Sequence, residues 1–145
     1  MSFLSSFNIS GSGLTAQKLR MDVISQNIAN AQVTRTQNGT PYRRKMTVLS
    51  SIEGGNSFKD VLEKASAVKT DGVQVSQIIE DPSDFVPVYD PGHPDANEEG
   101  YVMLPNVNVA QEMIDMLGAS RAYESNVTAL NATKAMILKA LEIGR

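Results

Sequence analysis

The sequence contains no cysteine, no tryptophan and a single histidine, and its net charge is only −3. The absence of cysteine excludes a disulfide framework, thiolate zinc sites and cysteine nucleophiles. No apolar stretch approaches the roughly 18 residues of a membrane-spanning helix. The first seven residues lack the basic and then apolar segments of a cleavable Sec signal. The slightly acidic balance argues against nucleic-acid binding as the main task of the protein.

Proline and charge divide the 145 residues into three segments. All six prolines lie between residues 41 and 105, so only the two ends can form long uninterrupted helices. Residues 34–50 carry a net charge of +4 and residues 51–105 one of −8, whereas both ends are nearly neutral. We therefore predict a terminal-helix coiled-coil domain from residues 1–33 and 106–145, and a β-rich middle domain from residues 34–105.

Both ends carry apolar residues in alternating steps of four and three, which is the spacing of a coiled-coil seam. Ser10-Gly11-Ser12-Gly13 interrupts the first repeat, and each helical glycine costs about 1 kcal/mol relative to alanine. We therefore predict poor helicity over residues 1–13 in an isolated monomer. Asn108 is the predicted cap of the C-terminal helix. The predicted assembly seam consists of Phe3, Phe7, Leu14, Met21, Ile24, Ile28, Val109, Met113, Met116, Tyr123, Val127, Leu130, Ile137 and Leu141.

Between the two helices the apolar period changes to two. This pattern predicts strands at residues 42–49, 72–79 and 85–89, the last at a sheet edge because Pro87 cannot donate a hydrogen bond. Residues 90–95 have the composition of a turn, and residues 58–67 are compatible with one short helix. The predicted fold class is α+β, with long terminal helices and a small β-rich middle segment.

No group of residues in the sequence predicts a catalytic, cofactor-binding or metal-binding site. His93 lies beside acidic residues, but without a second histidine or a cysteine we interpret it as part of a self-capping turn rather than a metal ligand or general base. No catalytic or phosphate-binding motif is present, so we expect no catalytic, cofactor-binding or metal-binding residues. The basic cluster Arg43-Arg44-Lys45 is predicted to meet the acidic region 80–99 of a neighbouring subunit, with pairing inside one chain or exposure to water as the alternatives.

The predicted helices carry few charges, and most of their remaining surface is Ser, Thr, Asn, Gln and Ala. A solvated two-helix coil normally carries charged residues beside its seam. Uncharged faces therefore favour burial against several identical or similar chains. The register would then be set by hydrogen bonds of the side chains of Asn27, Asn30, Asn126 and Asn131. An ordinary helical hairpin with a polar surface is the alternative.

Several of these segments resemble a known family. Ser12-Gly13-Leu14-Thr15-Ala16-Gln17, followed by Asn27-Ile28-Ala29-Asn30-Ala31, resembles the N-terminal signature of bacterial flagellar rod and hook proteins, the axial proteins of the flagellum. Further segments resemble the rod members of that family: Asp90-Pro91-Gly92-His93-Pro94-Asp95-Ala96, Gly100-Tyr101-Val102, Pro105-Asn106-Val107, Glu112-Met113-Ile114-Asp115-Met116, Ser120-Arg121-Ala122-Tyr123 and Asn126-Val127. The resemblance covers almost the whole chain.

The resemblance implies a structural protein rather than an enzyme. It implies a subunit of the proximal rod of the flagellar basal body, a periplasmic drive shaft that transmits motor torque. The terminal helices would form an antiparallel coiled coil through which the subunits polymerise. The implied partners are copies of the chain, other flagellar rod proteins, the export base of the basal body and the flagellar type III export apparatus. Export would occur without signal-peptide cleavage, and neither nucleic acid nor a membrane span is implied.

Two other classes of protein remain as alternatives. A secreted, soluble coiled-coil adaptor would form a discrete oligomer with complete helices in dilute solution. A cell-wall-acting enzyme, the less favoured alternative, would need a convergent pair of acidic residues.

Overall fold

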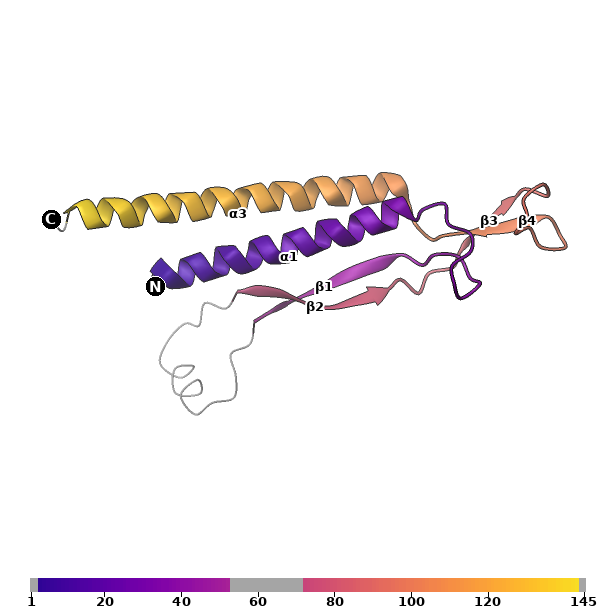
Figure 1. The fold of residues 1–145 in the computed structure, drawn as a ribbon, viewed down its shortest axis with the longest axis horizontal. Helices are drawn as coiled ribbons and strands as arrows, with labels where there is room; N and C mark the ends of the chain where they lie inside the picture. Colours follow the sequence, from indigo (N-terminus) through magenta and orange to yellow (C-terminus); the bar gives the residue numbers. More distant parts are fainter. Residues whose placement is uncertain (1–2, 53–71, 144–145) are drawn as a thin grey trace, which may run out of the picture. The chain divides into compact units, whose positions relative to one another are not determined.

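The computed structural model describes residues 3–52 and 72–143, and its elements make an α+β fold. Helix α1 (Phe3–Ala29) begins the chain and helix α3 (Val109–Ile143) ends it (Figure 1). The strands between them are β1 (Lys45–Ser51), β2 (Val73–Glu80), β3 (Val86–Tyr89) and β4 (Tyr101–Leu104). The predicted short helix at residues 58–67 lies outside the described residues.

The strands form two separate two-stranded sheets, β1 with β2 and β3 with β4. Two backbone hydrogen bonds show that β1 and β2 are antiparallel: Ile52 N donates to Gly72 O at 2.9 Å, and Asp81 N donates to Arg44 O at 2.8 Å. The sequence predicts β1, β2 and β3 to within a few residues. Each strand of a two-stranded sheet is an edge strand, so the structure confirms the predicted edge position of Pro87.

Strand β4 is not predicted from the sequence. It pairs with β3 in antiparallel register, with Val88 opposite Val102 and Tyr89 opposite Tyr101. The two tyrosine rings meet edge to face with their centroids 5.3 Å apart. Gly100 precedes β4 with a φ of 82°, a left-handed conformation that glycine adopts without strain.

Helix α1 is continuous through Ser10-Gly11-Ser12-Gly13. The predicted poor helicity of residues 1–13 concerns the isolated monomer in solution, and it stays a prediction. Ser12 Oγ donates to Ile9 O at 2.7 Å and accepts a hydrogen bond from Val73 N at 3.1 Å. A Cβ atom at Gly13 would lie 3.1 Å from the carboxamide of Asn126. The small residues therefore allow close packing here, which offsets the cost of glycine within the helix.

Helix α3 begins as predicted. Asn108 Oδ1 accepts hydrogen bonds from Ala110 N at 3.1 Å and from Gln111 N at 3.3 Å, which confirms Asn108 as the cap. At about 1.5 Å per residue, a helix of this length spans roughly 50 Å. None of the helices in the described part of the chain combines the length and hydropathy that a membrane crossing requires.

The chain forms two compact units. Unit 1 comprises Met1–Leu19, Leu49–Ser76 and Ser120–Arg145, and unit 2 comprises Arg20–Val48 and Gln77–Ala119. Each unit contains parts of both helices and of strands. The predicted division into a terminal-helix domain and a middle domain stays a prediction.

Each unit has a small core. In unit 1, Ala16 and Thr133 are buried, and in unit 2 the buried apolar residues are Val23, Ile24, Val102 and Ala119. Among the described residues, more large apolar side chains are exposed than buried. A single chain of this kind leaves much apolar surface for other contacts.

Candidate functional site

The centre of unit 2 is polar. Glu112 on α3 and Asn27 on α1 are each only 1% exposed. Asn27 Nδ2 donates to Glu112 Oε2 at 2.9 Å, and Arg44 Nε donates to Glu112 Oε1 at 2.6 Å. Both oxygens of the carboxylate are therefore hydrogen-bonded, and a neighbouring cation compensates its charge.

Asn27 uses its full hydrogen-bonding capacity. Its Oδ1 accepts hydrogen bonds from Lys45 N and from Tyr42 Oη, both at 2.9 Å. Its Nδ2 donates to Lys45 O at 2.8 Å in addition to Glu112. The carboxamide therefore pairs with the backbone of Lys45 much as a neighbouring strand would, and it joins α1, the first residue of β1 and α3.

Arg44 also contacts two further acidic side chains. Its Nη1 lies 3.4 Å from Asp81 Oδ2, and its Nη2 lies 3.7 Å from Asp115 Oδ2. Asp115 also pairs with Arg20 of α1 at 3.6 Å. These contacts, together with those of Glu112, Asn27 and Tyr42, are called the polar network below.

The environment fixes the charge states of this network. Burial lowers the pKa of Arg44, but the hydrogen bonds and charges of Glu112 and Asp81 outweigh it, so the net pKa is raised. Burial, followed by the charges of Glu112 and Glu80, raises the pKa of Tyr42. Hydrogen bonds from Ser83 lower the pKa of Asp81; burial partly opposes them, and Arg44 adds a further lowering, so the net pKa is lowered. At neutral pH Arg44 is therefore cationic, Tyr42 neutral and Asp81 anionic.

Two residues of the basic cluster, Arg43 and Arg44, bind groups of the same chain. Arg43 Nη1 donates to Asp81 O at 2.9 Å and to Ser83 O at 3.1 Å, and the Arg43 guanidinium lies 4.5 Å from the centre of the Phe85 ring. Arg44 binds the carboxylates described above. Pairing inside one chain, which the sequence left as an alternative, is therefore what the structure shows for these two arginines.

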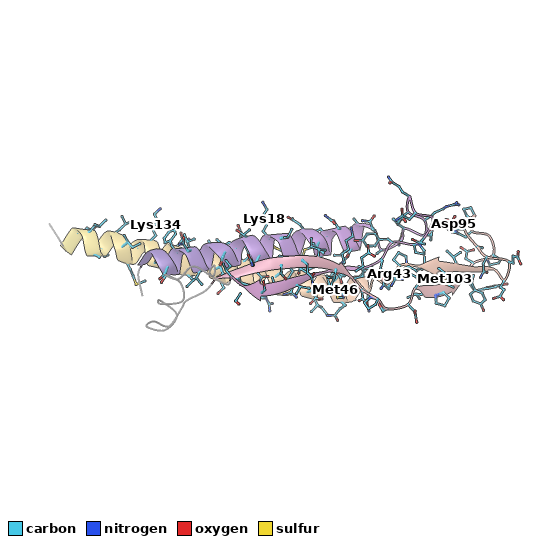
Figure 2. The ribbon with its side chains drawn as sticks, turned by 90° about the horizontal axis from the view of Figure 1, so that it is seen from below. Lys18, Arg43, Met46, Asp95, Met103 and Lys134 are labelled. Carbon is cyan, nitrogen blue, oxygen red and sulfur yellow. The ribbon has the colours of Figure 1, made fainter. Side chains whose placement is uncertain are left out.

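His93 forms hydrogen bonds within its own turn. Its Nδ1 accepts a hydrogen bond from Asp95 N at 3.1 Å, and His93 N donates to Asp90 O at 3.3 Å. The carboxylate of Asp95, a residue labelled in Figure 2, accepts a hydrogen bond from Thr34 Oγ1 at 2.8 Å and lies 3.7 Å from Arg35 Nη1. Within the described ranges, no group of three or more His, Asp or Glu side chains gathers in a way that would hold a metal ion.

The predicted seam residues fall into three groups. Ile24 is buried, and Phe7, Leu14, Met21, Ile28, Met116, Tyr123, Val127, Leu130 and Ile137 are half-buried. The side chains of Val109, Met113 and Leu141 are exposed. The side chain of Phe3 lies outside the described residues. The structure thus shows their exposure in a single chain, and their role in assembly stays a prediction.

Sequence reasoning singled out Asn27 for its side-chain hydrogen bonds, but it missed three other deeply buried residues: Ala16, Glu112 and Ala119. Ala16 and Ala119 are almost completely inaccessible, yet neither belongs to the predicted seam. The small size of alanine could have indicated these two positions, because small side chains allow a helix to approach a neighbouring element closely. Glu112 was also missed, since an acidic residue in the first turn of a helix is usually explained by the helix dipole.

Two family models match the ends of the chain. The model described as "Flagella basal body rod protein" matches residues 7–35. The model described as "Flagellar basal body rod FlgEFG protein C-terminal" matches residues 98–143. Asn27 lies in the first matched range, and Glu112 lies in the second.

Full-length relatives are also similar to the chain. A flagellar basal-body rod protein FlgC from Bacillus subtilis is 53% identical, with 100% of both chains covered. The FlgC protein of Borreliella burgdorferi is 44% identical over 99% of this chain and 98% of its own. That of Escherichia coli O6:H1 is 40% identical, again with 100% of both chains covered.

Proposed function

Because the chain belongs to the family of flagellar basal-body rod proteins FlgC, we propose that it polymerises through its two terminal helices. It is a structural subunit of the flagellar rod, located in the basal body. The proposal concerns how the subunit assembles: α1 and α3 pair as an antiparallel coiled coil, and their remaining apolar faces are covered by neighbouring subunits.

One observation carries the proposal. Met113, Ile114 and Leu117 lie on one side of α3 in unit 2 and are 58%, 64% and 52% exposed. Met113 and Ile114 precede Leu117 by four and three residues, so each of them neighbours Leu117 on the helix surface. These three residues are called the α3 patch below. Three large exposed apolar side chains so close together on a helix surface favour a surface that another protein covers.

The polar network supports this role. It connects α1 and α3 in unit 2 through buried hydrogen bonds that leave Glu112 and Asn27 little freedom. A helix held in this way presents its outer face in a fixed orientation, so less conformational entropy is lost when a neighbour binds. The charged residues thus stabilise the subunit, while apolar contacts join subunits.

The free energy of burying apolar surface between subunits is sufficient for assembly. At about 25 cal/mol per Å², burying 1,000 Å² of apolar surface contributes roughly 25 kcal/mol before the costs of ordering and association. Each subunit in a helical lattice has several neighbours, so individually weak contacts add together. Contacts of this kind would join copies of the chain, other flagellar rod proteins and the export base of the basal body.

The remaining parts of the proposal concern location and export. We infer a position in the periplasmic part of the rod, where the polymer transmits torque as a drive shaft. Export would proceed through the flagellar type III apparatus without signal-peptide cleavage. Support for this route comes from the rod proteins to which the chain is similar.

The two other candidate functions receive less support. The relatives are rod proteins and none is named as an enzyme, which favours a structural role over action on the cell wall. A soluble adaptor would form one discrete oligomer. The relatives are named as rod proteins, which instead favours continued addition of subunits.

Ile114→Asp tests the proposal. The side chain is exposed in the single chain, so the charge should change the free energy of unfolding by less than about 0.5 kcal/mol. It should nevertheless abolish motility in cells that lack their own copy, because a desolvated charge weakens the subunit contact. Ser25→Asp is the matched control, since Ser25 is an exposed residue of α1 and lies outside the patch. Secretion of both variants should be normal, and motile Ile114→Asp cells would contradict the proposal.

A further inference from the structure

Unit 1 contains an apolar groove between α1 and the β1–β2 sheet. Ala16 and Leu19 of α1 line one wall, and Ile52, Val73 and Val75 line the other. Its volume is about 320 Å³, and none of the described residues that line it is charged. An open space of this size accepts a few apolar side chains, and the polar network lies in the other unit.

The same unit also has an exposed apolar helix end. Gly13 of α1 lies against Asn126 of α3, and the two helices run in opposite directions (Figure 1). With equal rise per residue, Phe3 is therefore level with residue 136. Residues 137–143 of α3 extend beyond the first described residue of α1, and they are called the α3 tip below.

The chemistry of the α3 tip matches that of the groove. Leu138 and Leu141 are 52% and 66% exposed and lie three residues apart, so they share one face of the helix. Lys139 and Glu142 form an ion pair at 2.7 Å and offset each other's charge. The tip therefore offers two leucines, without net charge from its described residues, to a groove lined by uncharged residues.

The tip cannot fill the groove of its own chain. Asn126 marks the level of Gly13, so Leu141 stands about 14 residues of helical rise, roughly 20 Å, beyond Ser12 at the near end of the groove. The two surfaces are also different patches of one molecule. A contact between them in two copies is heterologous, and it repeats into an open polymer where the rotation does not close a ring.

We propose that the groove of unit 1 receives the α3 tip of a second copy of this chain. The proposal rests on the proposed function, because it assigns one of the contacts through which rod subunits join. Two leucines bury far less than the roughly 1,000 Å² of a stable interface, so this contact forms in the assembled rod and only transiently in dilute solution. Such a weak contact favours growth at an existing end over premature association.

Disulfide cross-linking tests the contact in the full-length chain, which has no cysteine of its own. Purified L19C is mixed with purified L141C under mild oxidation, and the heterodimer is measured on a non-reducing gel. K18C is the matched control, because Lys18 is exposed on α1 but does not line the groove (Figure 2). We expect the L19C–L141C yield to exceed the K18C–L141C yield about tenfold, which corresponds to about 1.4 kcal/mol of preference.

Equal yields would overturn the proposal. It would also be overturned if the L19C thiol were protected from a soluble thiol reagent in the isolated chain, since the chain itself would then fill the groove. In basal bodies purified from cells with the double variant L19C/L141C, oxidation should give disulfide-linked multimers. If the L19C thiol is protected in basal bodies but no multimers form, a different protein occupies the groove, and the proposal is wrong. The motility of Ile114→Asp cells tests the proposed function separately from this contact.

Discussion

Asn27 of α1 and Glu112 of α3 are 85 positions apart in the chain, yet Asn27 Nδ2 donates to Glu112 Oε2 at 2.9 Å. Both side chains are almost completely buried, and every polar atom of the two side chains has a partner. Buried polar groups that are fully hydrogen-bonded specify one arrangement of the elements that carry them. This pair therefore fixes how the two terminal helices meet in unit 2.

Glu112→Gln tests the charged part of the network. The amide keeps the shape of the side chain but removes the charge next to Arg44, so we expect the free energy of unfolding to fall by about 1–3 kcal/mol. Urea unfolding followed by circular dichroism measures this loss. Glu124→Gln, at an exposed position of α3, should change stability by less than about 0.5 kcal/mol. Equal effects of the two substitutions would show that the network does not stabilise the subunit.

Asn27→Ala tests the uncharged part. It removes four hydrogen bonds and leaves Glu112 and the backbone of Lys45 with unpaired groups, so we expect a loss of about 2–4 kcal/mol. Asn30→Ala is the control, because the carboxamide of Asn30 donates only one exposed hydrogen bond, to Gln26 O. The same urea experiment applies. A loss for Asn30→Ala as large as that for Asn27→Ala would contradict this interpretation.

Asp81 predicts a dependence of stability on pH. Its pKa in the folded chain is below the ordinary value of 3.8, because Ser83 and then Arg44 favour the carboxylate. A lowered pKa means that the stabilisation is complete above the unfolded value and is lost as the pH falls through the folded value. Asp81→Asn should therefore cost more stability at pH 7 than at pH 3. An equal cost at both values would contradict the prediction.

The two glycines of α1 should respond in opposite ways to alanine. Nothing lies within 4 Å of a Cβ at Gly11, so Gly11→Ala should stabilise the chain by about 0.5–1 kcal/mol through its higher helix propensity. At Gly13 a Cβ would press on the Asn126 carboxamide, and Gly13→Ala should cost about 1 kcal/mol net. Thermal unfolding of the two variants measures the difference. A gain in stability for Gly13→Ala would show that the helix contact is loose.

Much of the fold is predictable from local sequence. The proline-free ends indicate the two helices, and Asn108 marks the start of α3 because its side chain satisfies backbone donors only a few residues away. Strands β1, β2 and β3 follow from their period of two. Helix continuity through Gly11 and Gly13 is not predictable in this way, since the compensating contacts come from Val73 and Asn126, far along the chain.

The polar network is not predictable for the same reason. Nothing local distinguishes Glu112, which is buried, from Glu124, which is exposed on the same helix. Likewise, the composition of Arg43-Arg44-Lys45 indicates that acidic partners are needed, but not whether they belong to the same chain. Only the fold, which brings Asp81 and Glu112 to Arg44, decides between these alternatives.

The accessibility of the α3 patch in the assembled rod is the most direct test of the central claim. The variant L117C provides a single thiol in the patch, and S25C provides one on the exposed surface of α1, outside the patch. In the isolated chain both thiols should react readily with a soluble thiol reagent, since both side chains are exposed. In purified basal bodies we predict that the L117C thiol becomes protected by at least about tenfold in rate. Reaction of L117C at the same rate in the basal body and in the isolated chain would contradict assembly through this face.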